Sequence, residues 1–329
     1  MKKAKPIVVF LVKLLVSGGL IGYFLVRIHV ERSVDTLISA NLVFILAAVF
    51  VYLLSQAVSA VRWTVLVRPL GIETPFKDLA GYYLIGMFFN LFAPGTVGGD
   101  VSRVYYLVRD QHRDDQSRSA PTVNAAMSVL MDRAIGMTVL VWIGAAGLLL
   151  FPGYPVPPAI RSVTLLLALA FAAGTVLIPV LRRMLPEHGS SIIVKLRLVL
   201  RSYRAHWSAI VQGVLLSVIV HLIQASMHFV MGRALNLTIP FSFCLIIYPL
   251  VGTFASIPIS LNGLGLREGG YILMLGLIGI TAENGIAFGL LFFLIVAANS
   301  MLGGIIFLLT KHRKPSVNAA AARLDSTSE

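Results

Sequence analysis

Charged residues and cysteine are both scarce in this chain. Of its 329 residues only 12% are charged, whereas 57% are hydrophobic, and the mean hydropathy is +0.88. Soluble domains carry roughly 25% charged residues, so this composition argues against a soluble fold. The single cysteine, Cys244, excludes an internal disulfide, and its apolar neighbours give no sign of thiol chemistry.

Two sequence patterns that would announce common chemistries are also missing. The chain has no G-x-x-x-x-G-K-[ST] phosphate loop, which argues against nucleotide-driven work. It has no H-E-x-x-H pair and no cysteine partner for its histidines, so no metal ligand set is evident. We therefore predict no cofactor, no metal and no catalytic residues.

Long apolar runs are abundant instead. Each is long enough to cross a hydrocarbon core about 30 Å thick, and lipid leaves the helix as the default way to satisfy the backbone. The six runs lie near 7–26, 42–61, 125–151, 159–181, 209–232 and 284–310. The sequence predicts an all-α polytopic membrane protein, with one integral membrane domain at 1–314 and a disordered cytoplasmic tail at 315–329.

The first apolar run begins like a signal peptide, after Met-Lys-Lys-Ala-Lys. It is too long for a signal h-region, and no Ala-x-Ala-like site follows it. We therefore expect a retained first helix with a cytoplasmic N-terminus.

The formal net charge of +13, from 27 Lys and Arg against 14 Asp and Glu, would suggest nucleic acid as the partner of a soluble protein. Here the basic residues cluster at the ends of apolar runs. The excess of Lys and Arg in cytoplasmic loops explains them first, and attraction to anionic lipid headgroups explains them second. No nucleic-acid partner is predicted.

The stretch FFNLFAPGTVGGDVSRVYY, residues 88–106, interrupts an apolar segment with proline and glycine. If 79–99 crossed the membrane, ten basic residues would be placed on the outer side, against the charge rule. These are Arg103, Arg109, Arg113, Arg118, Arg182, Arg183, Lys195, Arg197, Arg201 and Arg204. We therefore predict a re-entrant segment that turns inside the membrane, where protein or water must surround it.

A second stretch, SIPISLNGLGLREGGY at 256–271, repeats the pattern Pro-x4-Gly-x3-Arg. The matched positions are Pro94 with Pro258, Gly99 with Gly263, and Arg103 with Arg267. A carboxylate lies beside each turn, Asp100 in the first and Glu268 in the second. Two Gly/Pro turns can also resemble one another by chance.

Three predicted spans separate the two stretches, so the second should enter from the opposite face, as in transporters built from inverted repeats. The segment 241–281 is either a re-entrant pair or two short spans. We predict six full spans plus two re-entrant or broken elements, about eight hydrophobic segments, with both termini cytoplasmic.

Three groups of polar residues fall within the apolar runs. Asn124, Ser128 and Asp132 share one helix face and either line a cavity or lock the bundle, with Arg133 adjacent. His221, Gln224 and His228 also share a face; interhelical hydrogen bonding is the favoured interpretation, and proton coupling through the histidines is an alternative. Arg62 and Trp63 are interpreted as interface anchors.

These residue types suit a lipid headgroup. Arginine binds phosphate in a fork geometry, and glycine turns before helix N-termini add backbone donors for anions. The carboxylates could hold a headgroup amine or neutralise the arginines of an empty site. The candidate binding residues are Asn90, Pro94, Gly98, Gly99, Asp100, Arg103, Asp132, Arg133, Pro258, Asn262, Gly263, Arg267 and Glu268.

Four stretches resemble the flippase-like membrane domain of lysylphosphatidylglycerol synthases. They are RW at 62–63, NLFAPGTVGGDVSR at 90–103, MDRAIG at 131–136 and PISLNGLGLREGG at 258–270. The resemblance extends from the first apolar run to about residue 310, although the family often has Glu where Asp132 stands. It implies an inner-membrane protein with re-entrant elements that moves or presents a lipid-linked substrate.

The full-length synthases add a soluble aminoacyl-transferase domain, which this sequence does not show, so we expect a stand-alone member that does not synthesise aminoacyl lipids. Related stand-alone members are tied to different lipids, so a phospholipid, a polyprenyl-linked sugar and a hopanoid all stay open. The leading hypothesis is a lipid translocase of the bacterial inner membrane, working passively or coupled to ions, with a homo-oligomer also compatible.

Two alternatives remain. An aspartyl intramembrane protease would use Asp100 and Asp132, although Val97 stands where its Gly-x-Gly-Asp pattern needs glycine. A non-transporting scaffold would instead partner a lipid-modifying glycosyltransferase.

Overall fold

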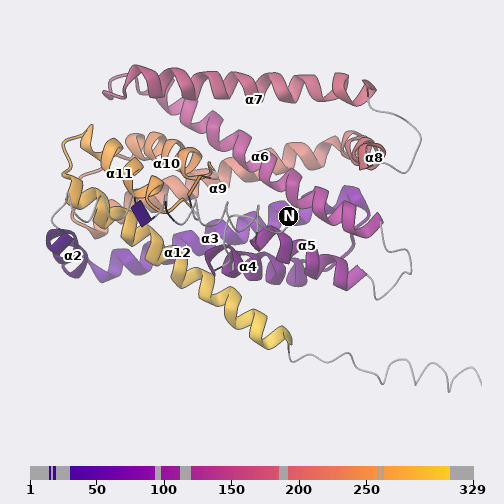
Figure 1. Cartoon of the computed structure of the whole chain (residues 1–329), viewed down its shortest axis with the longest axis horizontal. Coiled ribbons are helices and arrows are strands. Elements are labelled where there is room, and N and C mark those ends of the chain that lie inside the picture. The colour runs from indigo at the N-terminus through magenta and orange to yellow at the C-terminus, as the bar shows by residue number, and fades with distance from the viewer. Residues whose placement is uncertain are drawn as a thin grey trace, which may run out of the picture.

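The structure, a computed structural model, describes residues 15, 18–19, 30–92, 98–111, 120–184, 192–257, 259–260 and 263–311. Within these ranges the chain is helical and forms no strand. The α-helices are α2 (Val30–Ile38), α3 (Leu42–Val67), α4 (Phe76–Phe92), α5 (Gly98–Gln111), α6 (Ala120–Leu150), α7 (Pro158–Met184), α8 (Ile192–Ala205), α9 (Trp207–Ala234), α10 (Phe241–Ala255), α11 (Leu266–Gly276) and α12 (Ala282–Lys311), with a 3₁₀ turn η1 at Arg68–Leu70 (Figure 1). Most of the first apolar run, the tail 315–329 and the candidate residues Pro94, Pro258 and Asn262 lie outside the described residues.

Five of the described helices are long and apolar enough to cross a membrane. They are Leu42–Leu70, Thr122–Leu150, Pro158–Leu177, Trp207–Ala234 and Ala282–Thr310. Each coincides with one of the predicted runs. The all-α membrane fold is therefore confirmed, while the exact number of crossings stays a prediction.

Helix ends fall where the sequence carries capping signals. Asn41 precedes α3 and accepts a hydrogen bond from the Val43 backbone N–H at 3.0 Å. Gly71 ends η1 with φ +73°, a left-handed conformation that glycine adopts without steric penalty. Pro158 opens α7 at the position where its missing N–H is not needed.

Helices α3 and α9 form a closely packed antiparallel pair. The Asn41 backbone N–H donates to the Ala234 carbonyl at 2.8 Å, which joins the start of α3 to the end of α9. Farther along, Gln224 Nε2 donates to Ser55 Oγ at 2.8 Å. These polar links fix the register of two long helices whose other contacts are mostly apolar.

The first hairpin consists of α4 and α5. Tyr82 stacks on Tyr106 with ring centroids 5.4 Å apart, and Asn90 Oδ1 accepts a hydrogen bond from the Gly99 backbone N–H at 2.9 Å. Residues late in α4 therefore meet residues early in α5, so the two helices run antiparallel. A Cβ on Gly99 would overlap the Gly86 carbonyl oxygen and the Asn90 side chain, so this crossing needs glycine.

The second hairpin consists of α10 and α11, and two glycines with positive φ lie shortly before α11. Gly263 has φ +77°, and a Cβ there would lie 2.8 Å from the Ala255 carbonyl oxygen. Gly265 has φ +82° and directly precedes α11. Figure 1 shows the two hairpins at opposite ends of the bundle, α4 and α5 toward the end that carries α8, and α10 and α11 toward the end that carries α2.

The two ends differ in charge. The end with α8, called the basic end, carries twice as many cations as acids among the described residues: Arg68, Lys77, Arg109, Arg197, Arg201 and Arg204 against Glu73, Asp78 and Asp110. The end with α2, called the mixed end, carries both signs: Glu31, Arg32, Asp35, Arg161, Arg233 and Glu283. This asymmetry is the one that the positive-inside rule predicts for a cytoplasmic basic end.

Two hydrophobic clusters fill the bundle, one toward each end. The cluster toward the mixed end includes Met227, Phe243 and Phe288, and the cluster toward the basic end includes Trp63 and Leu107. On α3, Tyr52 belongs to the first cluster and Trp63 to the second. The buried polar residues of α3 lie between these two positions: Ser55, Gln56, Ser59 and Arg62. A polar layer therefore crosses the middle of an otherwise apolar molecule.

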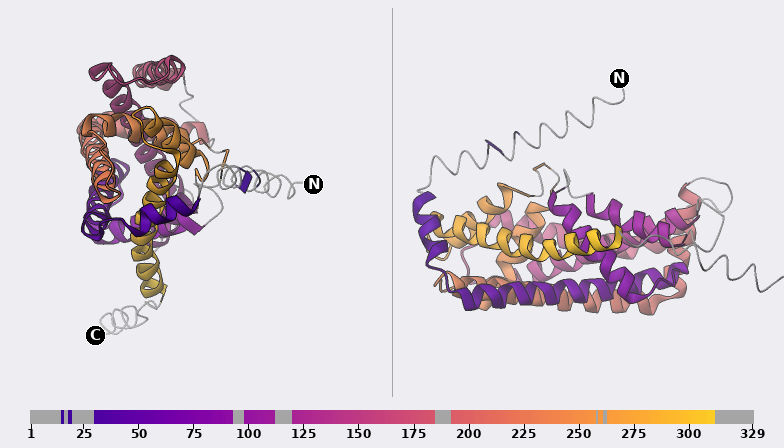
Figure 2. Two further views of the ribbon diagram at one scale, coloured as in Figure 1. Left: turned by 90° about the vertical axis from the view of Figure 1, so that its left-hand side faces the viewer. Right: turned by 90° about the horizontal axis from the view of Figure 1, so that it is seen from below.

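Two features were missed by the sequence analysis. Helix α8 forms in the basic segment that holds Arg197 and Arg204, and α2 forms around Glu31. Neither lies in one of the predicted apolar runs. Helix α7 packs on α6, and none of the apolar residues of its span Pro158–Leu177 is buried. It therefore lies at the edge of the bundle, as the end-on view in Figure 2 shows.

Candidate functional site

A cavity of about 420 Å³ lies in the polar layer between the two hydrophobic clusters. Residues of α3, α4, α5, α6, α9, α11 and α12 line it, so both hairpins reach it. Its charged lining residues are Arg62, Asp100, Arg103, Asp132, Arg133 and Arg267. Four cations against two anions give this set a net positive charge, which favours an anionic occupant.

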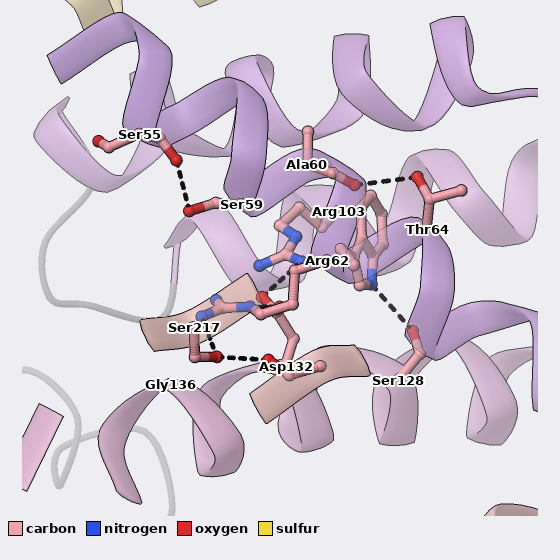
Figure 3. Close-up of polar contacts among 12 residues, drawn as sticks. Ser55, Ser59, Ala60, Arg62, Thr64, Arg103, Ser128, Asp132, Gly136 and Ser217 are labelled. Carbon is pink, nitrogen blue, oxygen red and sulfur yellow. Dashed lines mark hydrogen bonds and ion pairs between the residues drawn. The ribbon is translucent and has the colours of Figure 1, made fainter. Parts of the chain in front are cut away.

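Asp132 on α6 is the centre of the charge arrangement. Its Oδ1 accepts from Arg62 Nε at 2.8 Å and its Oδ2 accepts from Arg103 Nη2 at 3.0 Å (Figure 3). All three side chains are more than nine-tenths buried. One carboxylate thus neutralises one of two buried guanidinium groups, and Arg62 also donates to Ser217 Oγ at 2.9 Å.

Arg103 on α5 is held between aromatic rings. Its guanidinium carbon lies 4.2 Å from the centroid of Trp63 and 4.6 Å from that of Tyr83. Trp63 is fixed in turn by a hydrogen bond from its Nε1 to Ser128 Oγ at 3.2 Å. The buried Nε of Arg103 has no hydrogen-bond partner among the described residues. A planar, preorganised guanidinium with a donor to spare is suited to an oxyanion.

Asp100 forms a separate ion pair with Arg133 at a more open part of the cavity. The side chains are 21% and 45% exposed, so solvent reaches this pair. Asp100 and Asp132 are therefore each paired with arginine. An aspartyl protease instead requires two carboxylates that share one proton.

The second hairpin contributes Arg267, which lines the same cavity and is partly buried. Its guanidinium carbon lies 4.8 Å from the centroid of the Phe292 ring on α12. The neighbouring Glu268 is occupied locally, because its Oε2 accepts a hydrogen bond from the Gly265 backbone N–H at 2.6 Å. Glu268 thus caps α11 and does not line the cavity.

The remaining candidate residues play two kinds of role in the geometry. Asn90 lines the cavity and caps the start of α5 through Gly99. Gly98 is the first residue of α5, and Gly263 forms the turn before α11. These glycines allow close backbone approach, so their contribution to any binding site is through the position of the helices.

The polar face of α9 is hydrogen-bonded between helices, as the sequence predicted. His221 Nε2 donates to the Gly136 carbonyl at 2.9 Å, and its Nδ1 lies 2.8 Å from Tyr248 Oη. His228 Nδ1 donates to the Gln224 carbonyl at 2.8 Å, and its Nε2 lies 2.8 Å from Tyr271 Oη. Only His221 of the two lines the cavity, so proton coupling through either histidine stays a prediction.

The interpretation of Arg62 and Trp63 as interface anchors is wrong. Arg62 is 6% exposed and Trp63 is 0% exposed, because α3 continues to Val67 and places both inside the bundle. The spacing of Ser55, Ser59 and Arg62 on one face was the signal that pointed inward. Asn124, by contrast, donates to the Leu70 carbonyl at 3.2 Å and does not line the cavity.

Comparison with known proteins identifies two archaeal relatives. Over 97 residues the chain is 29% identical to the UPF0104 membrane protein PH1989 of Pyrococcus horikoshii, and over 95 residues it is 27% identical to the UPF0104 membrane protein MJ1595 of Methanocaldococcus jannaschii. The aligned stretch covers 29% of this chain and less than a third of each relative.

A family model covers far more of the chain. The model described as the lysylphosphatidylglycerol synthase TM region matches residues 10–304. Together with the five long apolar helices, this match makes the chain a multi-pass membrane protein. The chain belongs to the family of lysylphosphatidylglycerol synthase TM regions.

Proposed function

We propose that the chain is a lipid translocase that binds an anionic or lipid-linked headgroup in the central cavity, between the two hairpins. The observation that carries this proposal is that Arg62, Arg103 and Arg267, from three separate parts of the fold, line one cavity in the middle of an apolar bundle. Ionisable groups at membrane depth are costly and mark substrate pathways by default.

The cavity can replace the hydrogen bonds that a phosphate loses when it leaves water. Guanidinium groups supply charge-assisted hydrogen bonds, which are stronger than those between neutral groups. Asp132 compensates one of the two charges of Arg62 and Arg103 while the cavity is empty. An arriving phosphate competes with Asp132 for Arg103 and compensates the other charge. The net positive lining then balances the charge of the headgroup, and its acyl tails extend laterally between helices.

We infer that both hairpins are re-entrant. At 1.5 Å per residue, the 17 residues of α4 span about 26 Å and the 15 residues of α10 about 22 Å. Both are shorter than a hydrocarbon core of about 30 Å. Broken helices that meet near the midplane from opposite faces are a recurring transporter plan, and the opposite placement of the two hairpins fits it.

The basic end faces the cytoplasm in this proposal, in the inner membrane of a bacterium, with both termini on that side. Movement is passive or coupled to ions, with Asp132, Glu268, His221 and His228 as candidate proton carriers. Phospholipids, polyprenyl-linked lipids and hopanoids are the candidate substrates.

The test uses purified protein in vesicles with fluorescent phospholipids and labelled polyprenyl phosphates. We expect faster crossing than in empty vesicles, and we expect Arg103→Gln to remove most of the gain. Arg109→Gln is the matched control, because Arg109 lies on the same helix but is exposed and contacts the Tyr106 ring. If folded wild-type protein leaves lipid crossing as slow as in empty vesicles, the proposal is contradicted. Copurification of a glycosyltransferase would then favour the scaffold hypothesis.

Topology is tested separately with single cysteines in a Cys244→Ser background. Cysteines at Asp110 and Arg197, one at the C-terminal end of α5 and one in α8, should both react only from the cytoplasmic side. A periplasmic reaction at these two sites would make the first hairpin an ordinary crossing.

A further inference from the structure

A second large cavity lies on the flank of the bundle, apart from the central one. It is a groove of about 700 Å³ lined by residues of α6, α7, α8 and α9, and we call it the lateral groove. Helix α7, which packs on α6, contributes Thr175 to its lining. None of its lining residues lines the central cavity.

Helix α6 separates the two cavities. Asp132 and Gly136 face the central cavity, whereas Ile135, Val139 and Trp142 face the lateral groove. A headgroup held at Asp132 therefore cannot extend its tails into the groove without passing through α6. The groove is a site of its own.

The shape and lining of the groove suit an acyl chain. Along α6 it extends from Met131 to Trp142, which is about 16 Å at 1.5 Å per residue. This is about half of a hydrocarbon core 30 Å thick, the depth of one leaflet. Its walls are mostly apolar side chains, which an acyl chain can contact by van der Waals packing without burying a polar group.

Charge complementarity identifies the kind of lipid. Arg204, at the C-terminal end of α8, lines the groove and is exposed, and Trp207 beside it is 65% exposed. An exposed arginine beside a tryptophan is typical of the headgroup level of a membrane. Tyr203 holds this part of α8 in place, because its hydroxyl donates to the Leu66 carbonyl at 2.7 Å.

We propose that the lateral groove binds an anionic phospholipid from the leaflet at the basic end, with one acyl chain between α6 and α9 and the headgroup phosphate on Arg204. This lipid is a bound partner of the fold and is distinct from any lipid carried through the central cavity. The proposal does not depend on translocation.

The tryptophans provide the test, because Trp142 and Trp207 line the groove while Trp63 is fully buried beside Arg103. The protein is placed in lipid nanodiscs that contain phosphatidylcholine and either brominated phosphatidylglycerol or brominated phosphatidylcholine, and quenching is compared at equal mole fraction. We expect the anionic lipid to quench with about fivefold higher relative affinity, the factor that one basic residue near the surface contributes. The double variant W142F/W207F, which keeps Trp63, should show no such preference.

Two variants separate a defined site from general attraction to the basic end. Arg204→Gln should abolish the preference for the anionic lipid, whereas Arg201→Gln should leave it unchanged, because Arg201 is exposed on the same helix but does not line the groove. Ala134→Phe, which places a ring in the groove, should reduce quenching by the anionic lipid.

Equal quenching of the wild-type protein by both lipids would overturn the proposal. Equal losses in Arg204→Gln and Arg201→Gln would overturn it as well, since they would show attraction to the whole basic end. If neither brominated lipid quenches Trp142 and Trp207, the proposal is overturned, because protein, such as a second copy of this chain, then covers the groove.

Discussion

The first hairpin, α4–α5, and the second hairpin, α10–α11, each bring one arginine to the central cavity, but they hold it differently. Arg103 is buried, ion-paired with Asp132 and stacked on Trp63 and Tyr83. Arg267 is partly buried and lies over one ring, Phe292. The first arginine is therefore part of the packed interior, whereas the second is partly exposed.

The turns differ as well. Gly99 lies inside α5, and Arg103 is the sixth residue of that helix, whereas Gly263 precedes α11, and Arg267 is its second residue. The shared Pro-x4-Gly-x3-Arg spacing therefore does not preserve the turn geometry. Both hairpins nevertheless bring an arginine to the same cavity, which is what an anion-binding role requires.

The largest effect that this comparison predicts belongs to Asp132. Asp132→Asn removes the carboxylate that contacts Arg62 and Arg103, and leaves buried cations without compensation. We expect the free energy of unfolding to fall by about 3–5 kcal/mol, as for other broken buried ion pairs. Thermal unfolding in detergent micelles measures it.

The control is the acid of the second hairpin. Glu268→Gln keeps an oxygen that can accept from the Gly265 N–H, so we expect a loss of about 1 kcal/mol. Equal losses in Asp132→Asn and Glu268→Gln would show that the acid paired with the first hairpin's Arg103 contributes no more to stability than the capping acid of the second hairpin.

The second prediction concerns the turn glycines. Gly263→Ala forces an alanine into a left-handed conformation and against the Ala255 carbonyl, and we expect a loss of about 3 kcal/mol. Gly71→Ala has a similar φ but open space around the added Cβ, so about 1 kcal/mol is expected. The difference measures the close approach within the hairpin. If the two variants lose equally, close packing at Gly263 is not what stabilises the turn.

Much of the fold could be predicted from the sequence. The apolar runs located the five long helices, because a membrane span must be long and continuously apolar. Glycine positions are informative as well, because a Cβ on Gly303 of α12 would overlap the Leu84 carbonyl oxygen of α4. Amphipathic α8 was missed because its basic residues interrupt the apolar run, although its apolar residues recur at helical spacing.

The pairing of charges could not be predicted. Asp100 is the acid nearest to Arg103 in sequence, yet it pairs with Arg133, and Arg103 pairs with Asp132 across 29 positions. Which helix faces meet is decided by packing of the whole bundle, and periodicity within one helix does not specify it. Arg62 was misplaced because its apolar run ends near residue 61, whereas the helix continues for another turn and a half.

The third prediction separates function from stability. Under the proposed function, Arg267→Gln removes a charged donor from the cavity, and we expect lipid crossing to slow about tenfold, which corresponds to about 1.4 kcal/mol in the barrier. Because Arg267 is only partly buried, the unfolding free energy should change by less than about 1 kcal/mol. Arg103→Gln should lower both the rate of lipid crossing and the free energy of unfolding. Vesicle transport and thermal unfolding of the same preparations distinguish these outcomes, and loss of stability alone in Arg267→Gln would make that arginine structural.

The smallest effect is expected at the ion pair between Asp100 and Arg133. Both side chains are reached by solvent, so their attraction is screened, and Asp100→Asn should change the free energy of unfolding by less than about 1 kcal/mol. Measuring this variant at low and high salt, together with Arg133→Gln and the double variant, gives the coupling energy between the two residues. A coupling of several kcal/mol would mean that this pair is desolvated as thoroughly as Asp132 and its two arginines, and the first hairpin would then hold two buried ion-pair centres where the structure indicates one.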